Sequence, residues 1–215
     1  MSAPAPVYLL AASGLAREAV EAARAADQPV LGILDDDPSR HGTTCAGVDV
    51  LGPIDLAAEL QGGLVVCVGS GAGRRGIVDR LTRLGVGPDR YVPLAHPSAQ
   101  VPAGVRLGRG SIVLAGVVLT TDVLVGEHVV LMPTCVLTHD CRVDAYATLA
   151  AGVLAGGGVQ IRSAAYLGMG ASLHPGITVG ASAVLGMGSA ALTDIPDGEV
   201  WGGVPARPLA RRDGS

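Results

Sequence analysis

The chain has 215 residues and a formal net charge of −4, from 15 Lys and Arg against 19 Asp and Glu. It carries no basic cluster, which argues against a nucleic-acid partner. An aromatic content of 2% leaves few rings on which unpaired bases could stack. Hydrophobic residues make up 49% of the chain, which is enough for a substantial core and excludes global disorder.

The sequence predicts a cytoplasmic protein. The N-terminus lacks a basic segment and is interrupted by Pro4 and Pro6, so we expect no secretory signal peptide. A Gly-free apolar run of about 18 residues is absent, so we expect no membrane span. The four cysteines show no C-x-x-C spacing and are interpreted as reduced thiols. They are Cys45, Cys67, Cys135 and Cys141. Cys135 and Cys141 fall on inward positions and are expected to be small core residues.

Residues 1–94 have the pattern of a small α/β domain. Apolar runs alternate with segments whose apolar residues have helical spacing. In chain order we expect a strand at 7–11, a helix at 15–26, a strand at 29–34, a short helix at 55–60, a strand at 64–68, a helix at 74–84 and a strand at 91–94. This alternation predicts a parallel sheet of Rossmann type.

Three polar or Gly-rich turns follow the expected strands, at Ser13-Gly14, Asp35-Asp36 and Ser70-Gly71. In parallel α/β sheets, ligands bind beyond the carboxyl ends of the strands, where these turns lie. The first turn lacks the G-x-G-x-x-G sequence, so a dinucleotide cofactor is not predicted. A smaller nucleotide ligand and ordinary strand-to-helix turns both remain open interpretations.

The second half of the chain repeats every six residues. From Val101 to Leu185, fourteen of the fifteen positions reached in steps of six hold Val, Leu or Ile, and Ala155 is the exception. A hexapeptide repeat is typical of a parallel β-helix, in which three hexads form one triangular coil. We therefore predict a β-helix of about five coils over residues 95–192, followed by a C-terminal tail at 193–215.

Several segments resemble one family of acyl-CoA enzymes. They are Leu34-Asp35-Asp36-Asp37-Pro38, Ala95-His96-Pro97-Ser98-Ala99, Thr138-His139-Asp140-Cys141 and Gly203-Val204-Pro205-Ala206-Arg207. Over nearly its whole length the chain is similar to the family of sialic-acid O-acetyltransferases and bacillosamine-type sugar N-acetyltransferases. The resemblance implies a Rossmann-like sugar-binding domain, a left-handed β-helix, and acetyl-CoA as co-substrate without a metal. It also implies homotrimers with active sites between neighbouring β-helices.

His139 is the candidate general base. Acetyl transfer needs a group that removes a proton from the attacking amine or hydroxyl, and an imidazole suits this task near neutral pH. Asp140 could orient the ring and support its protonated form, although in the family this carboxylate is often Glu. The acceptor attacks the thioester directly, so no Ser nucleophile is needed. The alternative is that His139 is a solvated corner residue.

The resemblance also implies residues that bind acetyl-CoA. The backbone N–H of Gly157 would face the thioester carbonyl and stabilise an oxyanion. Several family members carry a second His nine residues after the first, and that position is Thr148 in this chain, which could donate a hydrogen bond. The residues expected along the CoA chain and its nucleotide are Met169, Met187, Ala206 and Arg207.

By the same resemblance, the N-terminal domain holds a nucleotide-linked sugar that touches Ser13, Gly14, Asp35, Asp36 and Ser70. The family turn usually reads Gly-x-x-Gly-His/Phe-Gly, whereas residues 11–16 read Ala-Ala-Ser-Gly-Leu-Ala. The methyl groups of Ala11 and Ala16, in place of two Gly, hinder the close approach of a diphosphate to the backbone. The side chain of Leu15, in place of His, cannot form a hydrogen bond. An acceptor other than the usual nucleotide amino sugar is therefore also an option.

Two further histidines are not candidates for catalysis. His96 lies where the β-helix begins and is interpreted as structural. His128 stands at a predicted coil corner and is expected at the surface.

The leading hypothesis is acetyl-CoA-dependent N-acetylation of an amino sugar, with a nucleotide-linked acceptor. The alternatives are O-acetylation of a sialic-acid-like sugar, acylation of a natural-product amine, and a non-catalytic sugar-binding scaffold. A zinc hydratase of the γ-carbonic-anhydrase kind needs three His ligands, usually with a close H-x4-H pair. It is not favoured, because no such pair is present.

Overall fold

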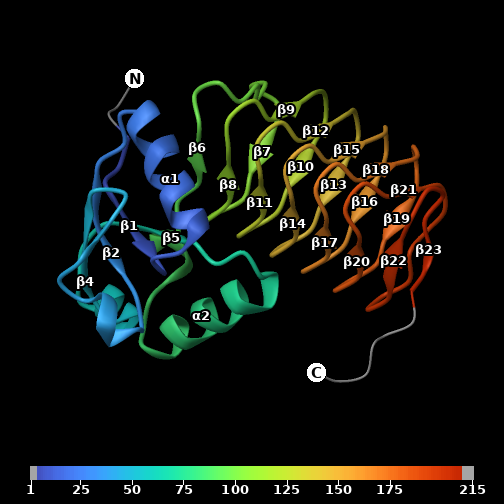
Figure 1. The fold of residues 1–215 in the computed structure, drawn as a ribbon. Helices are drawn as coiled ribbons and strands as arrows, with labels where there is room; N and C mark the ends of the chain where they lie inside the picture. Colours follow the sequence, from blue (N-terminus) through green and yellow to red (C-terminus); the bar gives the residue numbers. More distant parts are fainter. Residues whose placement is uncertain (1–3, 210–215) are drawn as a thin grey trace.

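The computed structural model describes residues 4–209, which form an α/β domain followed by a parallel β-helix (Figure 1). The strands and helices of the α/β domain are β1 (Val7–Leu10), α1 (Gly14–Ala25), β2 (Val30–Leu34), β3 (Thr44–Cys45), β4 (Val48–Gly52), β5 (Gly63–Val66) and α2 (Gly71–Arg83). Three short 3-10 helices are η1 (Pro38–Arg40), η2 (Ile54–Ala58) and η3 (Pro88–Arg90).

The α/β domain contains one sheet with the strand order β3-β4-β2-β1-β5. The strands β4, β2, β1 and β5 are parallel, and β3 pairs with β4 in the antiparallel direction. Buried residues of α1 pack on one side of this sheet and belong to a cluster that includes Ile112, Leu114 and Val130 of the β-helix. Helix α1 therefore lies between the sheet and the β-helix, and the two halves share an apolar core.

The β-helix has three faces, which we number in the order of the consecutive strands β7, β8 and β9. Face 1 contains β7 (Arg106–Leu107), β10 (Leu124–Val125), β13 (Arg142–Val143), β16 (Gln160–Ile161) and β19 (Thr178–Val179). Face 2 contains β6 (Leu94–Ala95), β8 (Ile112–Val113), β11 (Val130–Leu131), β14 (Thr148–Leu149), β17 (Tyr166–Leu167), β20 (Val184–Leu185), β22 (Val200–Gly202) and β23 (Arg207–Pro208). Face 3 contains β9 (Val118–Leu119), β12 (Val136–Leu137), β15 (Leu154–Ala155), β18 (Ser172–Leu173) and β21 (Ala190–Ala191).

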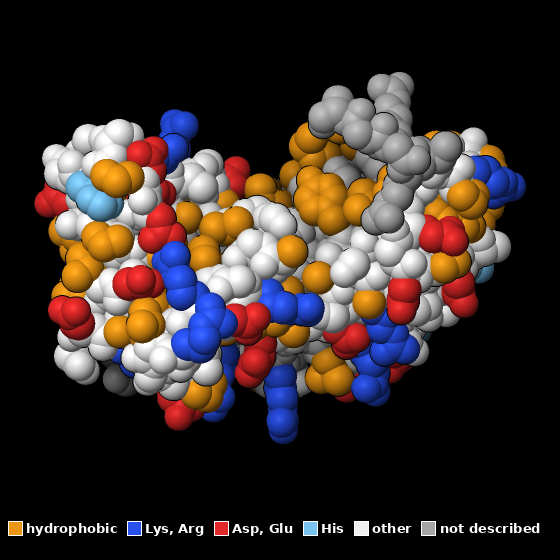
Figure 2. Space-filling view, turned by 90° about the horizontal axis from the view of Figure 1, so that it is seen from below, with side chains coloured by type: hydrophobic (Ala, Val, Ile, Leu, Met, Phe, Trp, Pro, Cys, Tyr) orange, Lys and Arg blue, Asp and Glu red, His pale blue; other side chains and the backbone are white. Residues whose placement is uncertain are grey.

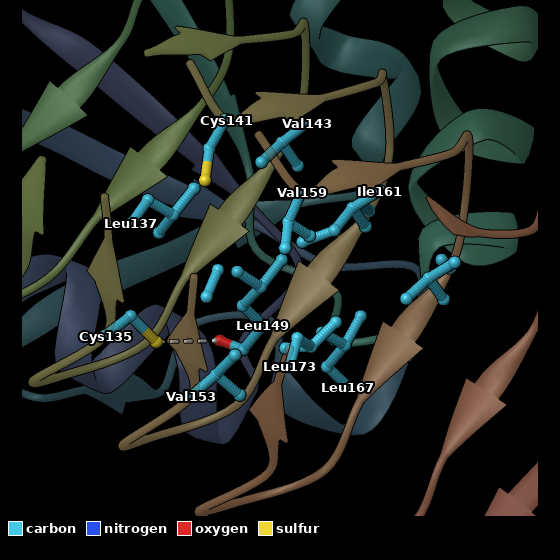
Figure 3. Packing of buried hydrophobic residues seen from close by; sticks show 14 of the residues in the cluster. Cys135, Leu137, Cys141, Val143, Leu149, Val153, Val159, Ile161, Leu167 and Leu173 are labelled. Carbon is cyan, nitrogen blue, oxygen red and sulfur yellow. Dashed lines mark hydrogen bonds between the residues drawn. The ribbon is translucent and has the colours of Figure 1, made fainter. Parts of the chain in front are cut away.

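The six-residue repeat is confirmed, and its aliphatic positions form the interior of the β-helix (Figure 3). All fifteen point into this core, and only Val101 and Leu107 in the first coil are partly rather than fully buried. Cys135 and Cys141 are buried beside them, as predicted, and burial raises the pKa of the Cys135 thiol to about 11. Strands eighteen residues apart pair in parallel register, as Leu131 does with Leu149.

The C-terminal end of the β-helix is closed by side chains and by a reversed strand. Asp194 accepts a hydrogen bond from the backbone N–H of Thr178 at 2.8 Å, and Asp197 accepts one from that of Ala181 at 2.7 Å. The last strand, β23, pairs with β22 in the antiparallel direction. These contacts satisfy backbone donors that a following coil would otherwise bind.

Two parts of the α/β domain differ from the sequence-based expectation. Strands β3 and β4 are additional, and the segment expected as a helix at 55–60 is the 3-10 helix η2, because so few residues cannot stabilise an α-helix. The strand expected at 91–94 is divided. Tyr91 forms an isolated bridge to Leu64, while Leu94 belongs to β6, which spans the expected domain boundary at 94/95.

A fully buried arginine connects the two halves. The guanidinium of Arg74, in α2, donates to the carbonyl oxygens of Val68 and Gly69 in the preceding turn at 2.8 and 3.0 Å. It also reaches the β-helix at distances of 2.8 to 3.0 Å. Its acceptors there are the carbonyl oxygens of His128, Tyr146 and Ala147 and the hydroxyl of Thr148. This one side chain thus fixes α2 to two segments of the β-helix, which belong to successive coils.

The expectation that His128 lies at the surface is wrong, because its side chain is only 3% exposed. Its ring stacks on Tyr146 of the next coil, with centroids 5.1 Å apart, and meets the edge of Tyr91 at 4.8 Å. Burial, with the nearby charge of Arg74, lowers the pKa of His128 to about 4, so the ring is neutral at neutral pH. This coil corner is covered by the α/β domain, which a sequence pattern does not reveal.

Charged side chains of both signs are mixed over the face shown in Figure 2, and no continuous basic surface appears there. No helix within residues 4–209 combines the length and apolar character needed to cross a membrane.

Replacing Arg74 by Met should lower the free energy of unfolding by about 2–4 kcal/mol, because several buried neutral acceptors lose their donor and each unsatisfied group costs about 1–3 kcal/mol. Urea denaturation at one fixed protein concentration measures this. Arg83→Met, at the exposed end of α2, should change the value by less than about 0.5 kcal/mol. Equal effects of the two substitutions would contradict the role given to Arg74.

Candidate active site

His139 and Asp140 lie at the corner where the chain passes from face 3 to face 1, after β12. Both side chains are 66% exposed, and Nδ1 of His139 lies 2.8 Å from Oδ2 of Asp140. A carboxylate can only accept, so it holds the proton of the neutral ring on Nδ1 and leaves the lone pair of Nε2 free. Asp140 has a φ of 62°, a conformation that Asp tolerates better than most residues. The pair has the arrangement of a general base with its orienting carboxylate.

Gly157 lies one coil further along the same corner, directly beside the ring of His139. A Cβ atom at Gly157 would overlap Cε1 and Nε2 of that ring. Among the described residues, the backbone N–H of Gly157 has no acceptor, whereas that of Gly158 donates to the carbonyl of His139 at 2.8 Å. The candidate base and a free backbone donor therefore lie next to each other at this corner.

Thr148 does not lie beside His139. It stands on β14 of face 2, where its hydroxyl accepts from Arg74 at 3.0 Å and donates to the carbonyl of Gly69 at 2.9 Å. The hydroxyl proton is thus already used in joining the two halves of the chain. Thr148 is therefore not a candidate for stabilising the oxyanion.

The residues expected to contact CoA lie at a different corner, between faces 2 and 3, or at the C-terminus. Met169 and Met187 follow β17 and β20 at equivalent positions of successive coils, and their side chains are 55% and 73% exposed. The side chain of Ala206 is buried in the β-helix core, so it can offer a ligand little, whereas that of Arg207 is exposed. Residues 210–215 of the expected tail lie outside the described residues.

The polar turns of the α/β domain cap helices and join strands. Ser13 caps α1 by accepting from the N–H of Ala16 at 3.1 Å, and Ser70 caps α2. The carboxylate of Asp35 accepts from the backbone N–H of Ala12 at 2.6 Å. Asp36 pairs with Arg80 at 2.9 Å. The carboxylates of Asp35 and Asp36 therefore stabilise the edge of the sheet at which the sequence predicts the sugar substrate.

A cavity of about 410 Å³ opens at the N-terminus of α1. Its lining includes Ser13, Gly14, Arg17 and Arg40, and Arg40 also donates to the carbonyl of Ala12. Two guanidinium groups near a helix N-terminus favour an anionic group. Sequence reasoning missed both arginines, because neither belongs to a motif.

A larger groove of about 1290 Å³ adjoins this cavity and shares Ser13, Gly14, Arg17 and Ala46 with it. One wall is α1, and the other is the corner between faces 2 and 3 of the β-helix. His139, Asp140 and Gly157 do not line this groove, because their corner lies at the opposite edge of face 3. Within one chain, the predicted base and the predicted substrate site are therefore separate.

Within residues 4–209, no three His, Cys, Asp or Glu side chains are grouped closely enough to hold a metal ion.

The chain was compared with proteins of known family or structure. No protein-family model and no curated protein matches it. A perosamine N-acetyltransferase from Caulobacter crescentus, in a structure with CoA and GDP-perosamine, is 32% identical. That match covers 95% of this chain and 97% of the other, with a TM-score of 0.88. The acetyltransferase domain of PglB from Neisseria gonorrhoeae, in complex with acetyl coenzyme A, is 29% identical over 96% and 100% of the two chains, with a TM-score of 0.86.

WeeI from Acinetobacter baumannii supports the same fold, with a TM-score of 0.83 over 95% of this chain and 99% of the other, at 23% identity. The matches to the perosamine N-acetyltransferase and to the PglB domain define the class of the chain as the hexapeptide-repeat acyltransferases, which are built on a left-handed β-helix. The chain belongs to the family of left-handed β-helix sugar acyltransferases that includes the perosamine N-acetyltransferase.

Replacing Gly157 by Ala should displace the ring of His139 and reduce acyl transfer by roughly 100-fold, the scale on which a positioned base contributes. The fold should persist, because the exposed ring can move away. Gly76→Ala, on α2 where no atom lies within 4 Å of the new Cβ, is the matched control. Steady-state rates and thermal melting of both variants test this, and an undiminished rate in Gly157→Ala would contradict the placement of the base.

Ala11 has a φ of 82°, in the left-handed region that costs an L-residue about 1–2 kcal/mol. The substitution Ala11→Gly should therefore raise the free energy of unfolding by up to about 1 kcal/mol, after the larger entropy of the unfolded chain is subtracted. Ala12→Gly, a buried position without a positive φ, should lower it. Thermal melting distinguishes the two, and a destabilised Ala11→Gly variant would show that no strain is stored there.

Proposed function

We propose that the protein transfers the acetyl group of acetyl-CoA to the amine of a nucleotide-linked amino sugar. The observation that carries this proposal is the His139–Asp140 pair beside Gly157, on a chain 32% identical to an N-acetyltransferase whose structure contains CoA and GDP-perosamine. Structures of that relative include variants in which one histidine is replaced. The PglB domain was solved with acetyl coenzyme A, which supports the same acyl donor.

In the proposed reaction, Nε2 of His139 removes a proton from the acceptor amine as its nitrogen attacks the thioester carbonyl. Asp140 keeps the other ring nitrogen protonated and stabilises the imidazolium that forms. The free backbone N–H of Gly157 donates to the oxygen on which negative charge develops. Collapse breaks the carbon–sulfur bond, and the imidazolium returns its proton to the CoA sulfur.

The site is completed by a second copy of the chain in the proposed homotrimer. His139 and the exposed methionines Met169 and Met187 occupy opposite edges of face 3, so one chain cannot present both to one thioester. Leu154, exposed on face 3 between these corners, adds apolar surface for such a contact. The base of one copy would then face the groove and the methionines of its neighbour.

The nucleotide of the acceptor is proposed to lie in the cavity at the N-terminus of α1. Arg17 and Arg40 supply positive charge for its phosphates, and Ser13 and Gly14 line the same cavity. These guanidinium groups could bind phosphate without the two glycines of the family turn, which are replaced by Ala11 and Ala16 in this chain.

A location in the reducing cytoplasm is proposed as well, and the four free cysteines accord with it.

The function is tested by release of the CoA thiol with a panel of nucleotide-linked amino sugars, free amino sugars, sialic acids and other amines, with product masses. We expect one added acetyl group on a nucleotide-linked amino sugar. The variant His139→Ala should lose at least about 100-fold in kcat while still binding CoA. The variant His174→Ala, which loses an exposed imidazole on the same edge of the β-helix, should keep its activity.

Acetylation of only a hydroxyl or of an unlinked amine would replace the proposed acceptor and keep the transferase. An unaltered rate in His139→Ala would remove that residue as the base. Sugar binding without acetyl transfer, and no binding of CoA, would favour the non-catalytic scaffold instead.

A further inference from the structure

One histidine is the first member of a column of otherwise apolar residues along the groove. The residues that occupy one equivalent position per coil, at the corner between faces 2 and 3, are eighteen apart: His96, Leu114, Met132 and Ala150. All four line the groove beside α1. His96 is therefore the single polar side chain of this column within the groove, at its end nearest the start of the β-helix.

Hydrogen bonds fix both the ring of His96 and the position of its proton. Nδ1 lies 3.0 Å from the backbone nitrogen of Ser98 and 2.7 Å from its hydroxyl oxygen. That hydroxyl oxygen accepts from the N–H of Gly116 at 3.1 Å, so its own proton is available for Nδ1. A backbone N–H can only donate, so Nδ1 is an acceptor and the neutral ring carries its proton on Nε2.

The Nε2–H group of His96 has no acceptor among residues 4–209. The two histidines are thus held in opposite forms. In His139 the carboxylate of Asp140 keeps the proton on Nδ1 and frees Nε2 to accept. In His96 the Ser98 turn keeps Nδ1 as the acceptor and leaves Nε2 able only to donate. The neutral ring of His96 is suited to binding an oxygen atom and not to removing a proton.

We propose that His96 is a specificity-determining residue that donates a hydrogen bond from Nε2 to an oxygen of the acceptor sugar. This inference rests on the proposed function. The groove and the cavity at the N-terminus of α1 share Ser13, Gly14 and Arg17. A nucleotide whose phosphates lie at Arg17 would therefore extend its sugar into the groove.

The composition of the groove matches the surface of a sugar ring. Leu114 and Met132 provide an apolar floor for the C–H face of the ring, whose hydroxyl oxygens need donors at its edge. The fixed Nε2–H of His96 supplies such a donor without loss of side-chain freedom on binding, since its ring is already held. A sugar without an oxygen at that place would leave the donor unpaired.

Two substitutions distinguish the role of the Nε2–H donor of His96 from that of the contact between Nδ1 and Ser98. His96→Asn keeps an oxygen that can accept from Ser98 but is too short to replace Nε2–H. His96→Gln can place an N–H near the former Nε2. We expect His96→Asn to raise KM for the acceptor about tenfold, as loss of one neutral hydrogen bond would. KM for acetyl-CoA and the melting temperature should stay unchanged, and His96→Gln should recover most of the loss.

The outcomes distinguish this inference from the function on which it rests. If the wild-type protein acetylates the sugar and His96→Asn has the same KM for it, the role of His96 is refuted and the function stands. If the wild-type protein acetylates no sugar, both are refuted. Equal losses in the two variants, with lowered melting temperatures, would show that His96 only holds the first coil together and would also overturn the inference.

Discussion

The arrangement of the whole chain depends on a buried guanidinium that has only neutral acceptors. Burial lowers the pKa of Arg74 to about 10, so the group is still charged at neutral pH, and backbone carbonyls surround it in place of a carboxylate. Those of Tyr146 and Ala147 lie at the coil corner directly before β14, whose position the parallel ladder already determines. Gly71 permits this approach, because a side chain there would overlap the carbonyl of Tyr146. Arg74 therefore orients the α/β domain against a rigid surface.

That orientation creates the surfaces on which the proposed chemistry rests. With α2 fixed at one corner of the β-helix, α1 lies along face 2 and forms the groove with the next corner. The same docking leaves the third corner, with His139, uncovered. In the proposed function, one edge of the molecule therefore presents the base, His139, and another presents the groove that binds the acceptor.

The β-helix could be predicted nearly residue by residue, because each inward position must be apolar and the spacing of six is never interrupted. His139 could be placed at a corner for the same reason. Strands β3 and β4 escaped prediction because few of their residues are buried and the run is short. The burial of His128 and the contact of Thr148 with Gly69 could not be predicted for another reason. The repeat shows that both side chains point outward, but it does not show which face the α/β domain covers. The position of the proton on His96 could not be predicted from the sequence, because the hydrogen bonds from Ser98 to Nδ1 determine it.

The closed end of the β-helix has a consequence for how copies can meet. A repeat of this kind presents open backbone edges at its ends and could, in principle, stack end to end into a fibre. Asp194, Asp197 and the reversed strand β23 occupy that edge, so a further chain cannot extend the ladder there. Growth along the axis is thereby blocked at this end, so the proposed homotrimer would have to form through the flanks of the β-helix.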